Sequence, residues 1–305
     1  MEQATKLNIS KNENTLKEGF KKEENFKPFG SLQRTVDTPK GNFEIYFVDG
    51  DESNMDQFQE YHKRIQPFLL YYVDEANFID SSDNLWTYFL LYLVQEKNGA
   101  KKYTFSGMMT VYKFWIFPDK MRPRISQVFV LPPFRHLGLA SALTQACYDQ
   151  FIPMKNVIEI SLEDPAIEFT QVVNYVDCCR FLRDESLRAI TADLKFAQLD
   201  EESRGANLKK FFKLVKPVMK MDRVQCLKVF SLLQLHALPR TQESLENFAK
   251  FLFEKTKNSL EEMASVKKRA NSERDMISDQ QIERRSKQTA ELYWITVLKL
   301  DKEFS

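Results

Sequence analysis

Residues 124–151, RISQVFVLPPFRHLGLASALTQACYDQF, decide the fold of this chain. The first part, 124–134, is rich in β-branched and aromatic residues and ends in two prolines, which predicts a strand and then a turn. In the second part, Leu137, Ala140, Leu143 and Cys147 recur at helical spacing on one face. The stretch therefore predicts a strand that leads through a glycine-bearing turn into a helix.

The flanking sequence extends this pattern in both directions. Strands are predicted at 42–50, 86–95, 156–164 and, as one long strand or a pair, 102–118, and further helices at 55–73 and 166–182. Beyond about residue 190, apolar residues recur at helical spacing through 205–235, 240–270 and 280–302, with breaks near Pro217 and Pro239. The fold class predicted is α/β, with a twisted mixed sheet flanked by helices and followed by a helical C-terminal region.

Three segments are predicted along the chain. Residues 1–25 are polar and poor in apolar side chains, so we expect a disordered segment there. Residues 26–190 hold the predicted strands and form the expected catalytic domain, and 191–305 form a helical C-terminal domain.

Composition excludes several classes of protein. The 305 residues contain 44 basic and 43 acidic side chains, which argues against a globally basic protein that coats nucleic acid. The four cysteines form neither a CxxC pair nor a zinc pattern, so we expect no metal site and no disulfide scaffold. Adjacent Cys178 and Cys179 are predicted to be core or near-surface thiols. Without a signal-like or membrane-spanning apolar run, a cytosolic or nuclear location is expected.

The turn between the strand and the helix has the chemistry of an anion site. Free N–H groups and the dipole at a helix N-terminus attract phosphate. Gly138 permits close approach of the chain to a phosphate, Ala140 is too small to obstruct it, and Arg135 can add a charge-assisted contact. The Walker and Rossmann glycine patterns are both missing. An ordinary strand-to-helix turn is the alternative interpretation.

The loop fits the pattern Gln/Arg-x-x-Gly-x-Gly/Ala of GNAT acetyltransferases. Longer phrases, EYHKRIQPFLLYYVDEANFID, MMTVYKFWIFPDKMRPRISQVFVLPPF and ISLEDP, resemble stretches of the catalytic subunits of type B histone acetyltransferases in the same order. The resemblance covers about residues 24–190. It implies a GNAT acyl-CoA N-acyltransferase fold and acetyl-CoA as co-substrate, with no metal.

The resemblance also implies where acetyl-CoA binds. The pantetheine arm would pair with the backbone of Val128, Phe129 and Val130, as an added strand would. A buried core strand is the alternative there, and both can hold because backbone groups do the binding. The pyrophosphate would lie on the amides of seven consecutive residues: Arg135, His136, Leu137, Gly138, Leu139, Ala140 and Ser141. Relatives favour Gln and more glycines in this loop.

Three carboxylates match the active site of that family. A lysine amine has an ordinary pKa near ~10.4, so it must lose a proton before it attacks a thioester. Glu163 matches the general base, and Asp164 and Asp74 match other carboxylates of the site. At Asp74 the family commonly has Glu, whose side chain is one methylene longer. The shorter side chain argues against direct proton abstraction by Asp74 and leaves it an electrostatic role. Without the resemblance, Glu-Asp-Pro after a strand is more often a solvated turn.

The resemblance further implies a protein substrate, the histone H4 tail. Trp86 and the segment Tyr112, Lys113 and Phe114 would line the groove that holds it, although simple packing explains the aromatic residues equally well. A WD-repeat histone-chaperone subunit is an expected partner, in nucleus and cytoplasm, with no direct binding to nucleic acid or membrane.

Relatives carry an additional N-terminal domain before the phrase KPFG. Two alternatives stay open, a GNAT enzyme for another protein or a small amine, and a non-catalytic acyl-CoA- or histone-binding module.

Overall fold

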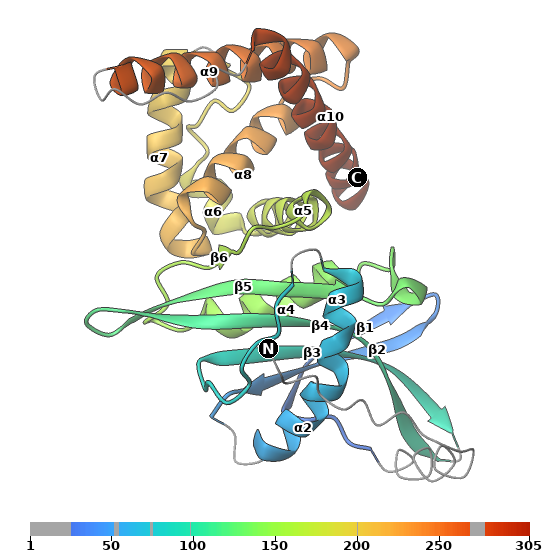
Figure 1. Ribbon diagram of the computed structural model, residues 1–305. Coiled ribbons are helices and arrows are strands. Elements are labelled where there is room, and N and C mark those ends of the chain that lie inside the picture. The colour runs from blue at the N-terminus through green and yellow to red at the C-terminus, as the bar shows by residue number, and fades with distance from the viewer. Residues whose placement is uncertain (1–25, 52–54, 74–75, 98, 200, 269–277) are drawn as a thin grey trace. The chain divides into compact units, whose positions relative to one another are not determined.

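The computed structural model describes residues 26–51, 55–73, 76–97, 99–199, 201–268 and 278–305 (Figure 1). Segment 1–25 and the carboxylate Asp74 therefore lie outside the described residues. The chain forms two compact units. Unit 1 comprises the described residues up to Lys113 together with Ile125–Cys147, and unit 2 comprises Phe114–Arg124 and Tyr148–Ser305. Position 190 falls inside unit 2, and the functional division at that position stays a prediction.

The strands follow one another in the sheet in chain order, β1-β2-β3-β4-β5-β6. Their bounds are β1 (Ser31–Thr38), β2 (Gly41–Asp49), β3 (Trp86–Lys97), β4 (Ala100–Ile116), β5 (Lys120–Val130) and β6 (Ser161–Leu162). β1 to β4 pair antiparallel with their neighbours. The predicted strands 42–50 and 86–95 are confirmed, 102–118 is one long strand, and β1 was not predicted.

The prediction of a strand over 156–164 is wrong in extent. Only Ser161 and Leu162 form β6. Before them, Val157 bridges to Met121 and Ile160 bridges to Met221. Because the segment changes partner within four residues, no continuous ladder of hydrogen bonds forms along it.

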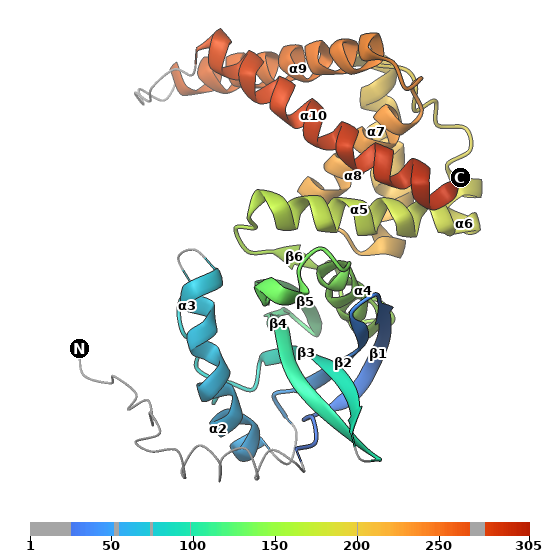
Figure 2. The ribbon, with the colours of Figure 1, turned by 90° about the vertical axis from the view of Figure 1, so that its right-hand side faces the viewer.

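In unit 1, helices cover both faces of the sheet (Figure 2). One face packs against α2 (Met55–Ile65), the 3-10 turn η1 (Gln66–Phe68) and α3 (Leu69–Tyr72), with Phe58 edge-on to Tyr88 at 4.7 Å between ring centroids. The sequence predicts one helix over 55–73, but Pro67 interrupts it.

The other face of the sheet is covered by α4 (Leu139–Phe151). Leu143 and Cys147 of the predicted apolar stripe are buried, as expected. The helix begins at Leu139 rather than at residue 135, because His136 and Gly138 have φ angles of 62° and 76° and cannot continue a right-handed helix.

Unit 2 is helical beyond β6, which confirms the predicted C-terminal region. Its helices are α5 (Ile167–Arg183), α6 (Glu185–Ile190), α7 (Glu201–Met219), α8 (Arg223–His236), α9 (Gln242–Lys268) and α10 (Asp279–Phe304). Phe211 and Phe230 pack at 5.3 Å in its core, and Cys178 and Cys179 are buried there. None of the described helices combines the length and the apolar composition needed to cross a membrane.

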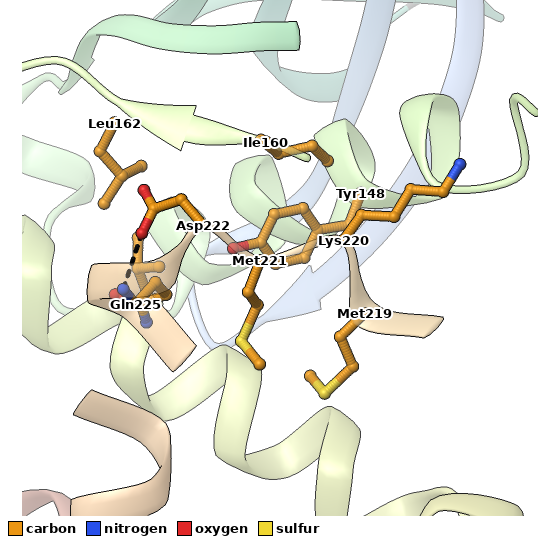
Figure 3. A pocket seen from close by; sticks show the side chains of 9 residues that line it. Tyr148, Ile160, Leu162, Met219, Lys220, Met221, Asp222 and Gln225 are labelled. Atoms are coloured by element: carbon orange, nitrogen blue, oxygen red, sulfur yellow. Dashed lines mark hydrogen bonds between the residues drawn. The ribbon is translucent and has the colours of Figure 1, made fainter. Parts of the chain in front are cut away.

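A small cavity in unit 2 opens beside the start of α8 (Figure 3). Asp222 caps this helix by accepting a hydrogen bond from the amide of Gln225 at 2.8 Å. Gln225 also lines the cavity, and its side chain donates to Asp177 at 2.9 Å and to Asn174 at 3.0 Å. The cavity therefore borders a buried polar cluster between α5 and α8.

Asp177 makes the stability of the protein depend on pH. Burial raises the pKa of its carboxyl from 3.8 to about 6, although the nearby Arg180 cation opposes that rise. Between these values the folded state binds more protons than the unfolded state, so the free energy of unfolding falls as pH rises from about 4 to about 7. Asp177→Asn is expected to remove this contribution, on the order of 1–3 kcal/mol. Urea denaturation at pH 5 and pH 7.5 measures it, and an unchanged pH dependence in the variant would contradict it.

Candidate active site

The end of β5 and the loop that follows it form the centre of the candidate site in unit 1. Residues alternate along β5, with Gln127 and Phe129 buried and Val128 and Val130 partly exposed. Gly107 of β4 lies directly against this strand, since a Cβ added to it would be 2.4 Å from the carbonyl oxygen of Phe129. The backbone at Val128, Phe129 and Val130 is thus set by close approach to β4.

An irregularity in β4 accompanies this approach. Leu91 pairs with Gly107 and Tyr92 pairs with Phe105, so Ser106 is an extra residue in β4. The carbonyl of Ser106 accepts a hydrogen bond from the amide of Leu131 at 2.8 Å. A bulge of this kind bends a strand and redirects its pairing. Here it fixes where β5 ends and the loop begins.

The loop itself is open to solvent. Arg135, His136 and Gly138 are exposed, and no atom lies within 4 Å of where a Cβ of Gly138 would stand. The first intrahelical bond of α4 runs from the amide of Ala142 to the carbonyl of Gly138 at 3.0 Å. The amides of the first turn, Leu139, Ala140 and Ser141, therefore have no acceptor within the helix.

Arg135 is held beside the end of β5. Its Nε donates a hydrogen bond to the carbonyl of Val130 at 3.0 Å, and its guanidinium lies over the ring of Tyr72 at 5.5 Å. The Val130 carbonyl, expected to be free for the pantetheine arm, is therefore engaged by the loop. A fixed cation, amides without an acceptor in the helix and the dipole of α4 together suit a pyrophosphate.

Gly138→Ala tests whether the loop conformation matters. At a φ of 76°, holding a residue with a side chain in this conformation costs about 1–2 kcal/mol of conformational free energy. If acetyl-CoA binds only this conformation of the loop, its affinity is expected to fall about 5- to 30-fold. Gly99, in the β3–β4 turn, has the same φ of 76° and equally open surroundings, so Gly99→Ala is the matched control. Isothermal titration with acetyl-CoA measures both variants. Equal affinity in the Gly138 variant and the wild type would contradict the loop assignment.

Of the predicted groove residues in unit 1, Trp86 and Tyr112 lie together, whereas the Lys113 side chain points to the opposite face of β4. Trp86 and Tyr112 form a cross-strand pair with ring centroids 4.9 Å apart. The Tyr112 hydroxyl donates to Asp83 at 3.1 Å. Lys113 is mostly buried, and its Nζ lies 2.6 Å from Asp49. Trp86 also packs against the apolar core of this unit, so the packing interpretation and the groove interpretation both fit its position.

Glu163, Asp164 and Phe114 belong to unit 2. Glu163 is exposed and lies 3.6 Å from Arg124, whose guanidinium lies over the ring of Phe114 at 4.4 Å. Asp164 is exposed with a φ of 33°. Arg124 therefore joins a predicted catalytic residue to a predicted groove residue. To accept a proton, Glu163 must exchange this ion pair for the substrate amine or a water molecule.

Three residues of this region were missed by the sequence reasoning. Gly107 had a signal, because a glycine inside an apolar strand indicates a bulge or a close backbone contact. Arg124 and Gln127 had none, since their partners lie far away in sequence. Among the described residues, no three His, Cys, Asp or Glu side chains gather closely enough to hold a metal ion.

Comparison with known proteins gives the candidate site its context. Residues 1–74 match the family model described as the N-terminus of histone acetyl transferase HAT1. The type B histone acetyltransferase catalytic subunit of Mus musculus is 34% identical over 184 residues, 57% of this chain and 44% of the relative. That of Mycosarcoma maydis is 37% identical over 125 residues, covering 41% of this chain and 28% of the relative. The chain thus spans less than half the length of these curated relatives.

Solved structures of acetyltransferases also match. The xEco2 acetyltransferase domain bound to a K105-CoA conjugate has a TM-score of 0.32 at 12% identity, covering 48% of this chain and 93% of that chain. Arabidopsis thaliana Naa50 in complex with a bisubstrate analogue has a TM-score of 0.25 at 17% identity. The match covers 39% of this chain and 70% of that chain. The sequence matches bear out the resemblance: over 57% of its length, this chain is similar to the catalytic subunit of a type B histone acetyltransferase.

Proposed function

We propose that this protein transfers the acetyl group of acetyl-CoA to lysine ε-amines of the histone H4 tail. The observation that carries the proposal is the turn between β5 and α4: Arg135, His136 and Gly138 are exposed there, and the amides of the first turn of α4 have no acceptor within the helix. The names of the curated relatives support histone as the substrate class. Preference for the H4 tail rests on the resemblance of the sequence.

In this proposal, acetyl-CoA supplies an activated thioester, and the chain supplies its binding and orientation. The amides of the first turn of α4 and the Arg135 guanidinium hold the pyrophosphate. The backbone at 128–130, held close to Gly107 of β4, is the part of β5 that binds the pantetheine arm. Because the other contacts use main-chain groups, Arg135 in place of the Gln of relatives is compatible with binding.

Glu163 is proposed as the general base. Its carboxylate accepts a proton from the lysine ammonium, directly or through one water molecule. The free amine then forms a bond to the carbonyl carbon of the thioester, and the C–S bond breaks. The proton that the attacking nitrogen loses goes to the departing sulfur, so coenzyme A leaves as the thiol. Asp164 and Asp74 add negative charge that attracts the lysine. No covalent acyl-enzyme is involved, since the cysteines Cys147, Cys178, Cys179 and Cys226 are buried.

For the protein substrate, we propose that the Trp86–Tyr112 pair, Lys113 and Phe114 contact the H4 tail. Aromatic rings suit the aliphatic stem and the cation of lysine. Association with a WD-repeat histone-chaperone subunit, and a location in nucleus and cytoplasm, are proposed from the same resemblance.

A substrate competition tests the function. The protein is incubated with labelled acetyl-CoA and, separately, an H4 tail peptide, an unrelated lysine peptide of equal charge, and a small polyamine. We expect kcat/KM for the H4 tail to exceed the others by about 10-fold or more, the gain that a few specific contacts provide. Equal rates would favour an acetyltransferase for another amine. Stabilisation by acetyl-CoA without any turnover would favour the non-catalytic module.

A further inference from the structure

Residues 76–85 join α3 to β3 without forming a helix or strand, yet their main chain is firmly held. Three glutamine side chains from three different elements bind it at alternate residues. Gln127 of β5 donates to the carbonyl of Asn77 at 2.7 Å, Gln66 of η1 accepts from the amide of Ile79 at 2.7 Å, and Gln59 of α2 donates to the carbonyl of Ser81 at 3.0 Å. We call residues 76–85 the clamped loop.

Gln127 has the most constrained position of the three. It is 6% exposed and lies on the buried face of β5, between Ile125 and Phe129. Its own amide donates to the Thr110 hydroxyl at 3.2 Å, and its Oε1 lies 3.4 Å from the same hydroxyl. The side-chain NH₂ of Gln127 takes no part in these two contacts and donates to the carbonyl of Asn77 instead. A buried amide in an apolar strand is unfavourable unless it is bonded, so its partner explains its presence.

The far end of the clamped loop reaches the predicted peptide groove. One carboxylate oxygen of Asp83 accepts from the Tyr112 hydroxyl at 3.1 Å, and the other accepts from the amide of Leu85 at 2.9 Å. Trp86 follows immediately and pairs with Tyr112. The clamped loop is therefore fixed to β5 at one end and to the aromatic pair at the other.

From this geometry we propose that Gln127 is a positioning residue for the protein substrate. It ties the clamped loop, which frames the Trp86–Tyr112 pair, to the strand whose next three residues are predicted to bind acetyl-CoA. The inference rests on the proposed function, because it presumes that a peptide binds beside this pair. Gln127 itself touches neither reactant.

Gln127→Glu is the sharpest test, since it keeps size and shape but replaces the NH₂ donor by an oxygen that repels the Asn77 carbonyl. At pH 8 we expect the KM for the H4 tail peptide to rise about 10-fold or more, with acetyl-CoA affinity unchanged. A buried carboxyl readily takes up a proton and then donates as the amide does. Peptide KM in the variant should therefore recover toward the wild-type value as pH falls from 8 to 6.

Gln234→Glu in unit 2 is the matched control. Gln234 is fully buried and also donates to a main-chain carbonyl, that of Gln198 at 3.1 Å. Its substitution should leave peptide KM unchanged. An unchanged peptide KM in an active Gln127 variant overturns the inference and leaves the function standing. If the Gln127 variant loses peptide binding and acetyl-CoA binding equally at every pH, the inference is also overturned, because such a loss indicates a general structural defect. Inactive wild type overturns the function and the inference together.

Discussion

Glu163→Gln is expected to lower the rate of acetyl transfer by about 10²-fold or more while acetyl-CoA still binds. The amide has the shape of the carboxylate but cannot accept a proton from the lysine ammonium. Since the side chain is exposed and paired with Arg124, its replacement should leave the fold intact. Initial rates with an H4 tail peptide from pH 6 to pH 10, together with acetyl-CoA titration, measure the two effects separately.

Glu168→Gln serves as the control for that experiment. Glu168 is another exposed glutamate of unit 2, in the first turn of α5, and we assign it no role in the site. Its substitution should leave the rate unchanged. Full activity in the Glu163 variant would remove Glu163 as the base and make Asp164 or Asp74 the next candidate. A similar loss in both variants would show a general effect of reduced negative charge.

Gly107→Ala is expected to destabilise the protein by about 3 kcal/mol and to weaken acetyl-CoA binding strongly. The added Cβ would lie 2.4 Å from the carbonyl oxygen of Phe129 and 3.0 Å from the Cα of Val130. Both contacts are backbone atoms, which cannot rotate away as the end of a side chain can. β5 must therefore shift, and with it the residues predicted to bind the pantetheine arm.

Thermal unfolding and acetyl-CoA titration measure the two consequences. Gly205→Ala is the control, because Gly205 lies in α7 with no atom within 4 Å of the added Cβ. There the substitution should stabilise the helix by up to about 1 kcal/mol. A Gly107 variant with wild-type stability and affinity would show that β4 and β5 can separate without cost to the site.

The parts of the fold that depend on local sequence could be predicted. Apolar spacing identified the helices of unit 2, and the double proline with Gly138 identified the loop before α4. Long-range pairing could not be inferred in this way. The segment 156–164 alternates like a strand, but its residues bridge to Met121 and then to Met221, so only β6 forms.

The residues of the candidate site likewise fall into those that local sequence predicts and those that depend on long-range contacts. The loop residues act through backbone groups whose conformation follows from a local motif. Gln127, Arg124 and Gly107 act through Asn77, Glu163 and Phe129, partners that only the folded chain brings close. A buried glutamine in a strand has no sequence signal until its partner is known, because polar residues also occur on exposed strand faces.

The most direct test of the central claim is a single-turnover experiment with the purified protein in excess over isotopically labelled acetyl-CoA. An H4 tail peptide is added, and both peptide and protein are analysed by mass spectrometry. We predict one labelled acetyl group on a peptide lysine, and none on the protein. Label that stays on coenzyme A while acetyl-CoA is bound would contradict the account.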